Sequence, residues 1–152
     1  MKKIFWSLLF FSLALSSCER DDLCLHQRVS PVVLRFRDAT TGEPRTVDSL
    51  RIKLDTLTLV PLSLTDSVAF YLPPEGGEQS LLFTWKNGAW EQTDTLLFRY
   101  RPREEFLSKA CGFILIMDSL DIHPASHHWI QRVEILQPTV KEDTSAHANI
   151  YF

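Results

Sequence analysis

Apolar and polar residues alternate along most of the chain after residue 30, and strong turn formers separate the alternating runs. Successive side chains of a β-strand point to opposite faces, so a period of two is typical of strands that bury one face. Seven or eight short strands at this spacing predict an all-β fold, an antiparallel β-sandwich of the immunoglobulin-like kind. The only helix candidate is a short turn at "PREEFLSKA". The runs that predict strands are "PVVLRFRD", "SLRIKLDTLTLVPL", "DSVAFYL", "SLLFTW", "TLLFRYR", "CGFILIM", "HWIQRVEILQP" and "AHANIYF".

Three runs carry finer predictions. The run "SLRIKLDTLTLVPL" changes the parity of its alternation, which predicts a bulge or a short break near Asp55. In "WKNGAW", Asn87 and Gly88 both tolerate positive φ and predict a type I′ hairpin turn. With that turn, Trp85 and Trp90 lie directly opposite each other and form a cross-strand pair. The run "CGFILIM" is apolar on both faces, as expected of a central strand that is covered on both sides.

The first 17 residues have the pattern of a secretory signal peptide. Lys2 and Lys3 precede an apolar run at 4–15, and Ser16 and Ser17 supply the small residues that a signal peptidase needs. The run is too short for a stable membrane span, which needs about 20 apolar residues. We therefore expect residues 1–17 to be removed.

The segment Leu15-Ser16-Ser17-Cys18 has the form of a bacterial lipobox, in which the cysteine is acylated and the chain is cut just before it. This predicts a lipidated Cys18 with a tether over 18–29, followed by a β-sandwich domain over 30–152. Two or more acyl chains hold a protein stably on a membrane, so Cys18 would be the membrane anchor. An ordinary secretory signal with a chance cysteine is the alternative.

The other two cysteines are Cys24 and Cys111. Outside the cytoplasm two remaining thiols usually form one bridge, so we expect a disulfide between them. On the chain-entropy model, closing a loop of this length contributes about 4 kcal/mol to stability. Two free buried thiols are the alternative.

Length and charge exclude several classes of function. About 135 residues after the predicted cleavage site suffice for one domain. The formal net charge is −3, with acidic and basic residues interspersed, so no basic stripe for a nucleic acid is present. We expect no nucleic-acid partner and no cofactor.

The mature chain resembles a family of Bacteroidetes lipoproteins that is classed only as a domain of unknown function. The segments that carry the resemblance are "CERDDLC", "FRD", "DSVAFYLP", "SKACGF", "HHWIQRVEIL" and "AHANIYF". The resemblance implies a small lipoprotein of a Gram-negative cell envelope, and it transfers no catalytic residue. Acidic residues after the anchor cysteine can belong to a surface-export signal in such lipoproteins, and Glu19, Asp21 and Asp22 resemble one. We expect an outer-membrane lipoprotein on either the periplasmic face or the cell surface.

Sequence motifs for catalysis are missing: the chain has no GxSxG, HExxH, Walker, GxGxxG or CxxC motif. We therefore expect no enzyme and name no catalytic residue. His123, His127 and His128 are weak candidates for a zinc or copper site, because three imidazoles could hold such an ion if the loop folded around them. Pro124 breaks any helix across the set. His26 and His147 are interpreted as surface residues.

The aromatic residues suggest where a partner could bind. Trp85 and Trp90, with Tyr71 and Tyr100, could stack against sugar rings, although aromatic residues of alternating strands are more often core residues. A protein partner would meet the terminal strand "NIYF" or the Trp85/Trp90 hairpin, since an exposed sheet edge can accept another strand. The leading interpretation is a lipid-anchored, non-catalytic interaction or accessory module of the cell envelope whose partner is unknown, with an envelope protein or a glycan as the candidates. A glycan-binding module and a metal-binding protein are the alternatives.

Overall fold

The computed structural model describes residue 24, residues 26–141 and residues 145–152. The predicted signal peptide, Cys18 and the acidic residues that follow it lie outside this part of the chain. Nine strands are formed within it, and it contains no helix that could cross a membrane. The strands are β1 (Val32–Arg37), β2 (Val47–Leu54), β3 (Leu57–Thr65), β4 (Ser67–Phe70), β5 (Gly77–Asn87), β6 (Trp90–Ser108), β7 (Gly112–Pro124), β8 (Arg132–Ile135) and β9 (Ala148–Tyr151).

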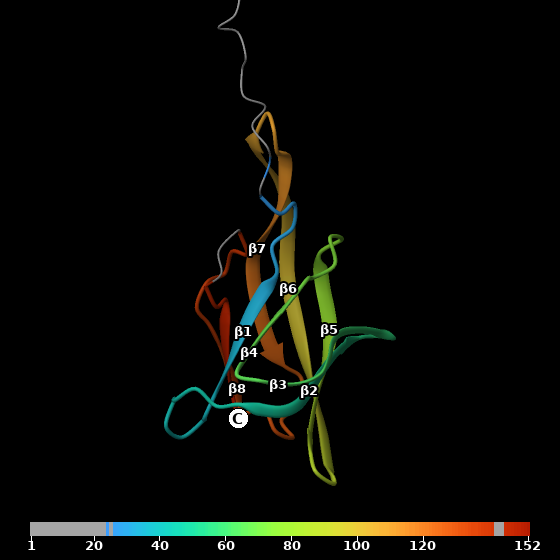
Figure 1. The fold of residues 1–152 in the computed structure, drawn as a ribbon, viewed down its shortest axis with the longest axis vertical. Coiled ribbons are helices and arrows are strands. Elements are labelled where there is room, and N and C mark those ends of the chain that lie inside the picture. The colour runs from blue at the N-terminus through green and yellow to red at the C-terminus, as the bar shows by residue number, and fades with distance from the viewer. Residues whose placement is uncertain (1–23, 25, 142–144) are drawn as a thin grey trace, which may run out of the picture.

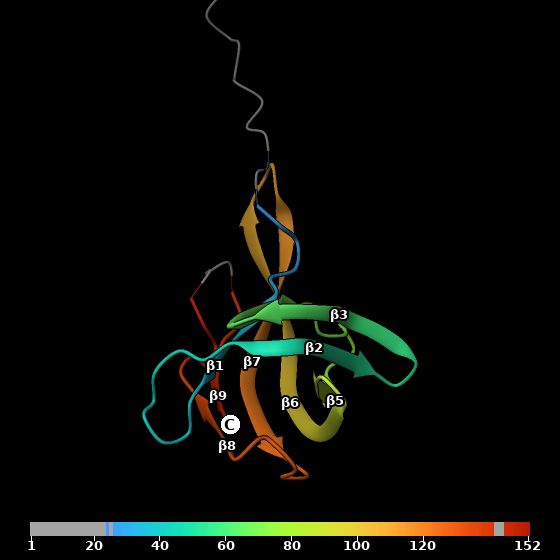
Figure 2. The same cartoon turned by 60° about the horizontal axis from the view of Figure 1, so that its bottom comes forward.

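The strands form two sheets, in the orders β4-β1-β9-β8 and β3-β2-β5-β6-β7 (Figure 1). All neighbouring strands are antiparallel except β1 and β9, which are parallel. The predicted all-β antiparallel sandwich is therefore confirmed, with nine strands rather than seven or eight. Figure 2 shows β2 and β3 side by side at one end of the five-stranded sheet.

The alternating runs bury the faces that their period predicts. Val32, Leu34 and Phe36 of β1 are at most 1% exposed, and the apolar positions of β5 and β6 meet them from the other sheet. Phe83 and Phe98 stack with their ring centroids 6.2 Å apart. Burying side chains of this size supplies the main driving force for closing the two sheets on each other.

One local prediction is corrected by the structure, and a second, the short break near Asp55, is confirmed as a turn. Most of the segment predicted as a short helical turn, "PREEFLSKA", continues β6 to Ser108 and pairs with β7, because ladder hydrogen bonds override the helix propensity of its Glu residues. The parity change near Asp55 marks a hairpin turn that separates β2 from β3, with Leu54 opposite Leu57. Asp55 has a φ of 51°, a conformation that aspartate tolerates better than most residues.

Two strands lie at positions in their sheets that differ from the predicted ones. The strand that contains "GFILIM", β7, lies at a sheet edge and not at the centre. Apart from Phe113, its apolar residues are still covered, because its outer edge accepts other segments: Leu115 N–H donates to the Arg28 carbonyl at 2.7 Å, and Met117 pairs with Val140. The terminal strand β9, predicted as an exposed edge, lies between β1 and β8 and is buried at every position.

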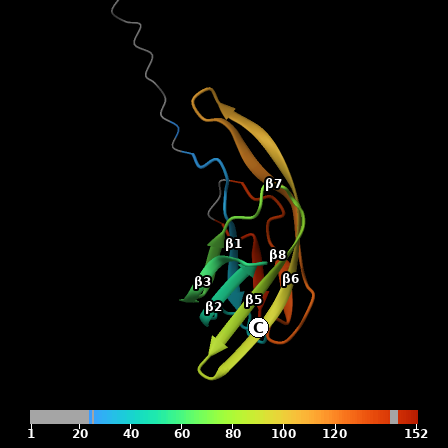
Figure 3. The ribbon, with the colours of Figure 1, turned by 90° about the vertical axis from the view of Figure 1, so that its right-hand side faces the viewer.

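Strand β6 connects the two ends of the molecule. At one end it forms a hairpin with β5, and at the other it forms a hairpin with β7 that extends beyond the sandwich (Figures 1 and 3). We call this second hairpin the arm, comprising 101–108 of β6, the turn at 109–111 and 112–118 of β7. The register shifts between Arg99 and Arg101, and Ser119 on the opposite strand has a φ of 56°. This bulge lies at the base of the arm.

A disulfide between Cys24 and Cys111 ties the N-terminal segment to the tip of the arm. The two Cα atoms are 4.9 Å apart, and the cysteines are 87 positions apart in the sequence. The predicted pairing is confirmed. It places the start of the described chain at the end of the molecule that lies opposite the β5–β6 hairpin.

Candidate functional site

The hairpin between β5 and β6 turns one residue later than its sequence predicts. Asn87 pairs with Trp90, and Trp85 pairs with Gln92, so Gly88 and Ala89 form the turn. The predicted Trp85/Trp90 cross-strand pair is therefore wrong. Gly88, with a φ of 59°, stands at the first central position, the only one at which a type II′ turn requires a positive φ.

This register places four side chains on one face of the hairpin. Paired residues of an antiparallel ladder share a face, as do residues two apart on one strand. Trp85, Asn87, Trp90 and Gln92 together line a hollow of about 240 Å³, which we call the Trp90 slot. Trp90 is 72% exposed, whereas Trp85 is only partly exposed. The slot is thus lined by the exposed indole of Trp90, the partly exposed indole of Trp85 and two side-chain amides.

Trp85 is held from behind by aromatic side chains of other elements. Its ring centroid lies 5.7 Å from that of Trp129 and 5.6 Å from that of Phe152. Trp129 is fixed in turn, because its Nε1–H donates a 3.0 Å hydrogen bond to the carbonyl of Phe83. The inner wall of the slot is therefore continuous with the hydrophobic core.

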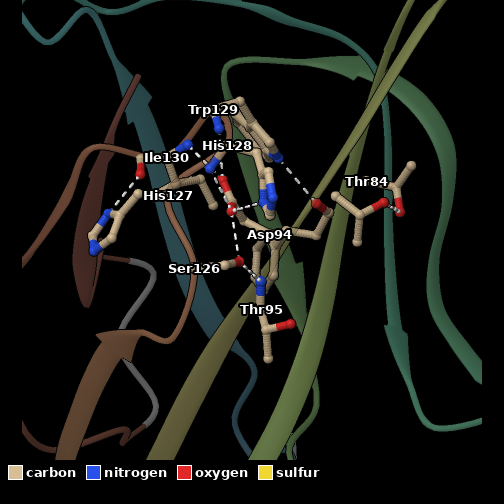
Figure 4. A network of polar contacts seen from close by, with 10 residues as sticks. Thr84, Asp94, Thr95, Ser126, His127, His128, Trp129 and Ile130 are labelled. Carbon is tan, nitrogen blue, oxygen red and sulfur yellow. Dashed lines mark hydrogen bonds and ion pairs between the residues drawn. The ribbon is translucent and has the colours of Figure 1, made fainter.

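A buried carboxylate organises the segment that carries Trp129 (Figure 4). Asp94 stands opposite Phe83 in the β5–β6 ladder and is 0% exposed. One of its oxygens, Oδ2, accepts hydrogen bonds from the backbone N–H groups of Trp129 and Ile130, each at 2.7 Å. The other, Oδ1, accepts from the Ser126 hydroxyl at 2.6 Å, the His128 backbone N–H at 2.7 Å and His128 Nδ1 at 3.0 Å.

These five hydrogen bonds keep Asp94 ionised. Burial on its own raises the pKa of the carboxyl, but the hydrogen bonds from three backbone N–H groups and the Ser126 hydroxyl outweigh it and hold the pKa well below its usual range. All five donors belong to residues 126–130. The arrangement is that of a structural anchor for residues 126–130, which positions Trp129 behind the slot.

Asp94 is the residue that sequence reasoning missed. Its signal was present: Asp94 shares the parity of Leu96 and Phe98, so an acidic residue falls on the inward face of a strand. A buried carboxylate must be hydrogen-bonded, which predicts a partner segment rich in donors. The identity of that segment could not be read from the alternation.

The three histidines proposed as metal ligands contact three different groups. His123 Nε2 lies 2.6 Å from the carboxylate of Asp121. His127 Nδ1 donates to the Ile130 carbonyl at 3.1 Å, and His128 Nδ1 donates to Asp94. Among the residues that the structure describes, no group of three or more His, Cys, Asp or Glu side chains is placed to hold a metal ion.

The remaining candidate residues lie away from the slot. Tyr71 is 52% exposed, and its hydroxyl donates to Gln27. Tyr100 is buried and donates to the Pro73 carbonyl at 2.7 Å, and burial raises its pKa to about 12. His26 is exposed as predicted, but His147 is 0% exposed and its Nδ1 accepts the Val33 N–H at 3.0 Å. His147 lies just before β9, and the prediction failed because that strand is central.

A family model described as a family of unknown function (DUF6452) matches residues 44–152. No curated protein and no solved structure matches the chain. The matched range includes every residue of the Trp90 slot and the Asp94 anchor, together with the arm.

Proposed function

The chain belongs to this family of unknown function, and we propose that it is a lipid-anchored, non-catalytic binding module of a bacterial cell envelope. In this proposal Cys18 carries the lipid, the origin is a Bacteroidetes lipoprotein, and the protein is held on the outer membrane. The observation that carries it is the placement of two features at opposite ends of β6. The Trp90 slot lies at one end, and the disulfide to Cys24, six residues after Cys18, lies at the other.

The disulfide supports an envelope location. Structural disulfides form and persist outside the reducing cytoplasm, in the periplasm or at the cell surface. The lipobox at Leu15-Ser16-Ser17-Cys18 and the Cys24–Cys111 bridge therefore point to the same compartment by independent routes.

The geometry supports display of the slot away from the membrane. At about 3.3 Å per residue, the 19 residues of β6 span up to about 60 Å. The proposed anchor, Cys18, is six residues before Cys24, whose disulfide to Cys111 lies at the Ser108 end of this strand. Trp90 lies at the opposite end of the strand. A ligand can thus reach the slot without approaching the lipid.

A binding role fits the chemistry of the polar groups better than a catalytic one. Asp94, a buried carboxylate two residues after Gln92 of the slot, uses its hydrogen bonds to hold residues 126–130. The slot itself presents indole rings and amides, which are groups that recognise ligands but do not act as nucleophiles or general bases at neutral pH.

The composition of the slot favours a glycan as its ligand. Exposed aromatic faces stack on the apolar faces of sugar rings, and side-chain amides both donate and accept hydrogen bonds with hydroxyl groups. Trp90 supplies the exposed face, and Asn87 and Gln92 supply the amides within the same hollow. An envelope protein that inserts an apolar side chain is the other class of partner.

The test is a screen of the purified protein against envelope and host oligosaccharides, followed by calorimetric titration of each hit. Replacing Trp90 by alanine should weaken binding by about two- to tenfold, since stacking beyond simple area burial contributes about 0.5–1.5 kcal/mol. Phe113→Ala is the matched control, because Phe113 is an aromatic residue with similar exposure at the opposite end of β6. Equal affinity of the two variants would remove the slot from the proposal.

A further inference from the structure

Two aromatic side chains are exposed together at the tip of the arm. Phe106 of β6 and Phe113 of β7 stand opposite each other, with their ring centroids 5.5 Å apart in an edge-to-face arrangement. They are 56% and 60% exposed, and neither belongs to the core cluster. The folded domain therefore leaves this apolar pair uncovered.

The chain enters the folded domain beside this pair. Cys111 lies two residues before Phe113, and its disulfide brings Cys24 to a Cα distance of 4.9 Å. Further along, Arg28 hydrogen-bonds to Leu115 on the edge of the arm. The N-terminal segment is thus fixed along the arm by a covalent bond and by backbone pairing.

The distance from the tip to the proposed anchor is short. Six residue steps separate Cys18 from Cys24, and a fully extended chain of that length spans about 21 Å at most. A lipid on Cys18 therefore keeps Phe106 and Phe113 close to the bilayer surface, whatever path the intervening residues take.

The charged side chains on and beside the arm neither favour nor oppose a contact between the arm and a bilayer. Arg103 pairs with Asp118 at 2.7 Å, and Lys141 pairs with Glu105 at 2.7 Å, so these charges are locally balanced. Aromatic residues are favoured at the interface between lipid headgroups and acyl chains, where apolar faces are buried without crossing the membrane. A neutral bilayer surface is therefore sufficient.

We propose that the tip of the arm inserts Phe106 and Phe113 into the headgroup region of the membrane that holds Cys18, as a second membrane contact that orients the domain. This inference rests on the proposed lipid anchor and deepens it. The contact would set β6 at a steep angle to the bilayer and direct the Trp90 slot away from it.

Quenching of tryptophan fluorescence by brominated lipid tests this contact. The acylated protein is purified from bacterial envelopes and placed in phosphatidylcholine vesicles with or without bromine on the acyl chains. The variant Phe113→Trp puts a new fluorophore at the tip, and Leu57→Trp is the matched control because Leu57 is also 60% exposed but lies at the β2–β3 turn. The emission that Phe113→Trp adds should fall by roughly half in brominated vesicles, while the emission that Leu57→Trp adds stays constant.

The outcomes separate the two proposals. The mass of the mature N-terminal peptide reports acylation of Cys18 directly, and its absence would overturn both the anchor and the arm contact. With the acyl mass present, equal quenching of the two variants would overturn the arm contact alone. A shift of the Phe113→Trp emission that depends on protein concentration and not on bromine would assign the tip to a second copy of the chain, and would equally overturn the lipid contact.

Discussion

Replacing Asp94 by asparagine tests whether the buried carboxylate holds residues 126–130 in place. The change keeps the size of the side chain but puts an NH₂ group where one oxygen stood. If the NH₂ faces the Oδ2 position, the backbone N–H groups of Trp129 and Ile130 lose their acceptor. If it faces the Oδ1 position, the backbone N–H of His128 loses its acceptor. Either orientation leaves a buried donor opposite another donor.

The expected loss of unfolding free energy is about 3 kcal/mol. A hydrogen bond to a charged group contributes about 1.5–3 kcal/mol, and a buried donor without a partner costs about 1–3 kcal/mol. At least one such bond is lost, and the others lose their charge assistance. Since domains of this size are stable by about 5–15 kcal/mol, the variant should fold but with a much lower denaturation midpoint.

The pH dependence gives a second, sharper signature. The pKa of Asp94 is depressed in the folded protein, so its stabilising contribution is complete above the unfolded pKa of about 3.9 and is lost as the pH falls towards the folded value. The difference in stability between the wild type and Asp94→Asn should therefore be constant near neutral pH and shrink below about pH 4. Exposed carboxylates with lowered pKa values, such as Asp38 and Glu134, are common to both proteins and cancel in the difference.

Urea denaturation, followed by far-ultraviolet circular dichroism between pH 3 and pH 7, measures both effects. Asp121→Asn is the matched control, because it makes the same chemical change at a 46% exposed side chain, whose carboxylate pairs with His123 on the surface. Its cost should stay below about 1 kcal/mol. The reasoning is refuted if Asp94→Asn costs no more than this control, or if its cost is independent of pH down to pH 3.

Two further predictions concern the turn at Gly76 and the disulfide. Gly76→Ala should lower the free energy of unfolding by about 3 kcal/mol, because φ is +71° and a Cβ atom would lie 2.3 Å from Cδ of the Pro102 ring; Gly77→Ala, with a φ of +83° and open space, should cost only about 1 kcal/mol. Equal thermal denaturation midpoints for these two variants would contradict the packing argument. Replacing Cys24 and Cys111 together by serine should cost up to about 4 kcal/mol and should abolish the sensitivity of wild-type stability to reductant. An unchanged response to dithiothreitol in the double variant would show that the bridge is not its source.

The sandwich could be predicted from the sequence because its main determinant is local. Alternation at Leu96, Phe98 and Tyr100 is set by the strand period, and each of these residues is buried as the pattern requires. The disulfide could also be predicted from the sequence, because only two cysteines follow the predicted anchor. These features need no knowledge of which strand lies beside which.

The positions of strands within a sheet could not be predicted in this way. Strand β9 pairs in parallel with β1, more than 100 residues away, and nothing in "NIYF" distinguishes a central strand from an edge. The predicted turn of the β5–β6 hairpin, on which the Trp90 slot depends, was wrong for a different reason. Asn87-Gly88 satisfies a type I′ turn, but Gly88 also satisfies the first position of a type II′ turn, and a shift of one residue changes every partner in the hairpin.

That one-residue shift changes what the hairpin can do. In the predicted register Trp85 and Trp90 would form a direct cross-strand pair, and each indole ring would bury part of its surface against the other. In the observed register Trp85 packs against Trp129 and Phe152, while Trp90 stands diagonally across from it with most of its surface free. Asp94 supports this division by holding the backbone of Trp129 through a carboxylate whose hydrogen bonds go to residues 126–130. A ligand that packs against Trp85 would meet a side chain already fixed by Trp129 and Phe152, so little conformational entropy of that side chain is lost, which is the physical advantage of a preformed site over one assembled on binding.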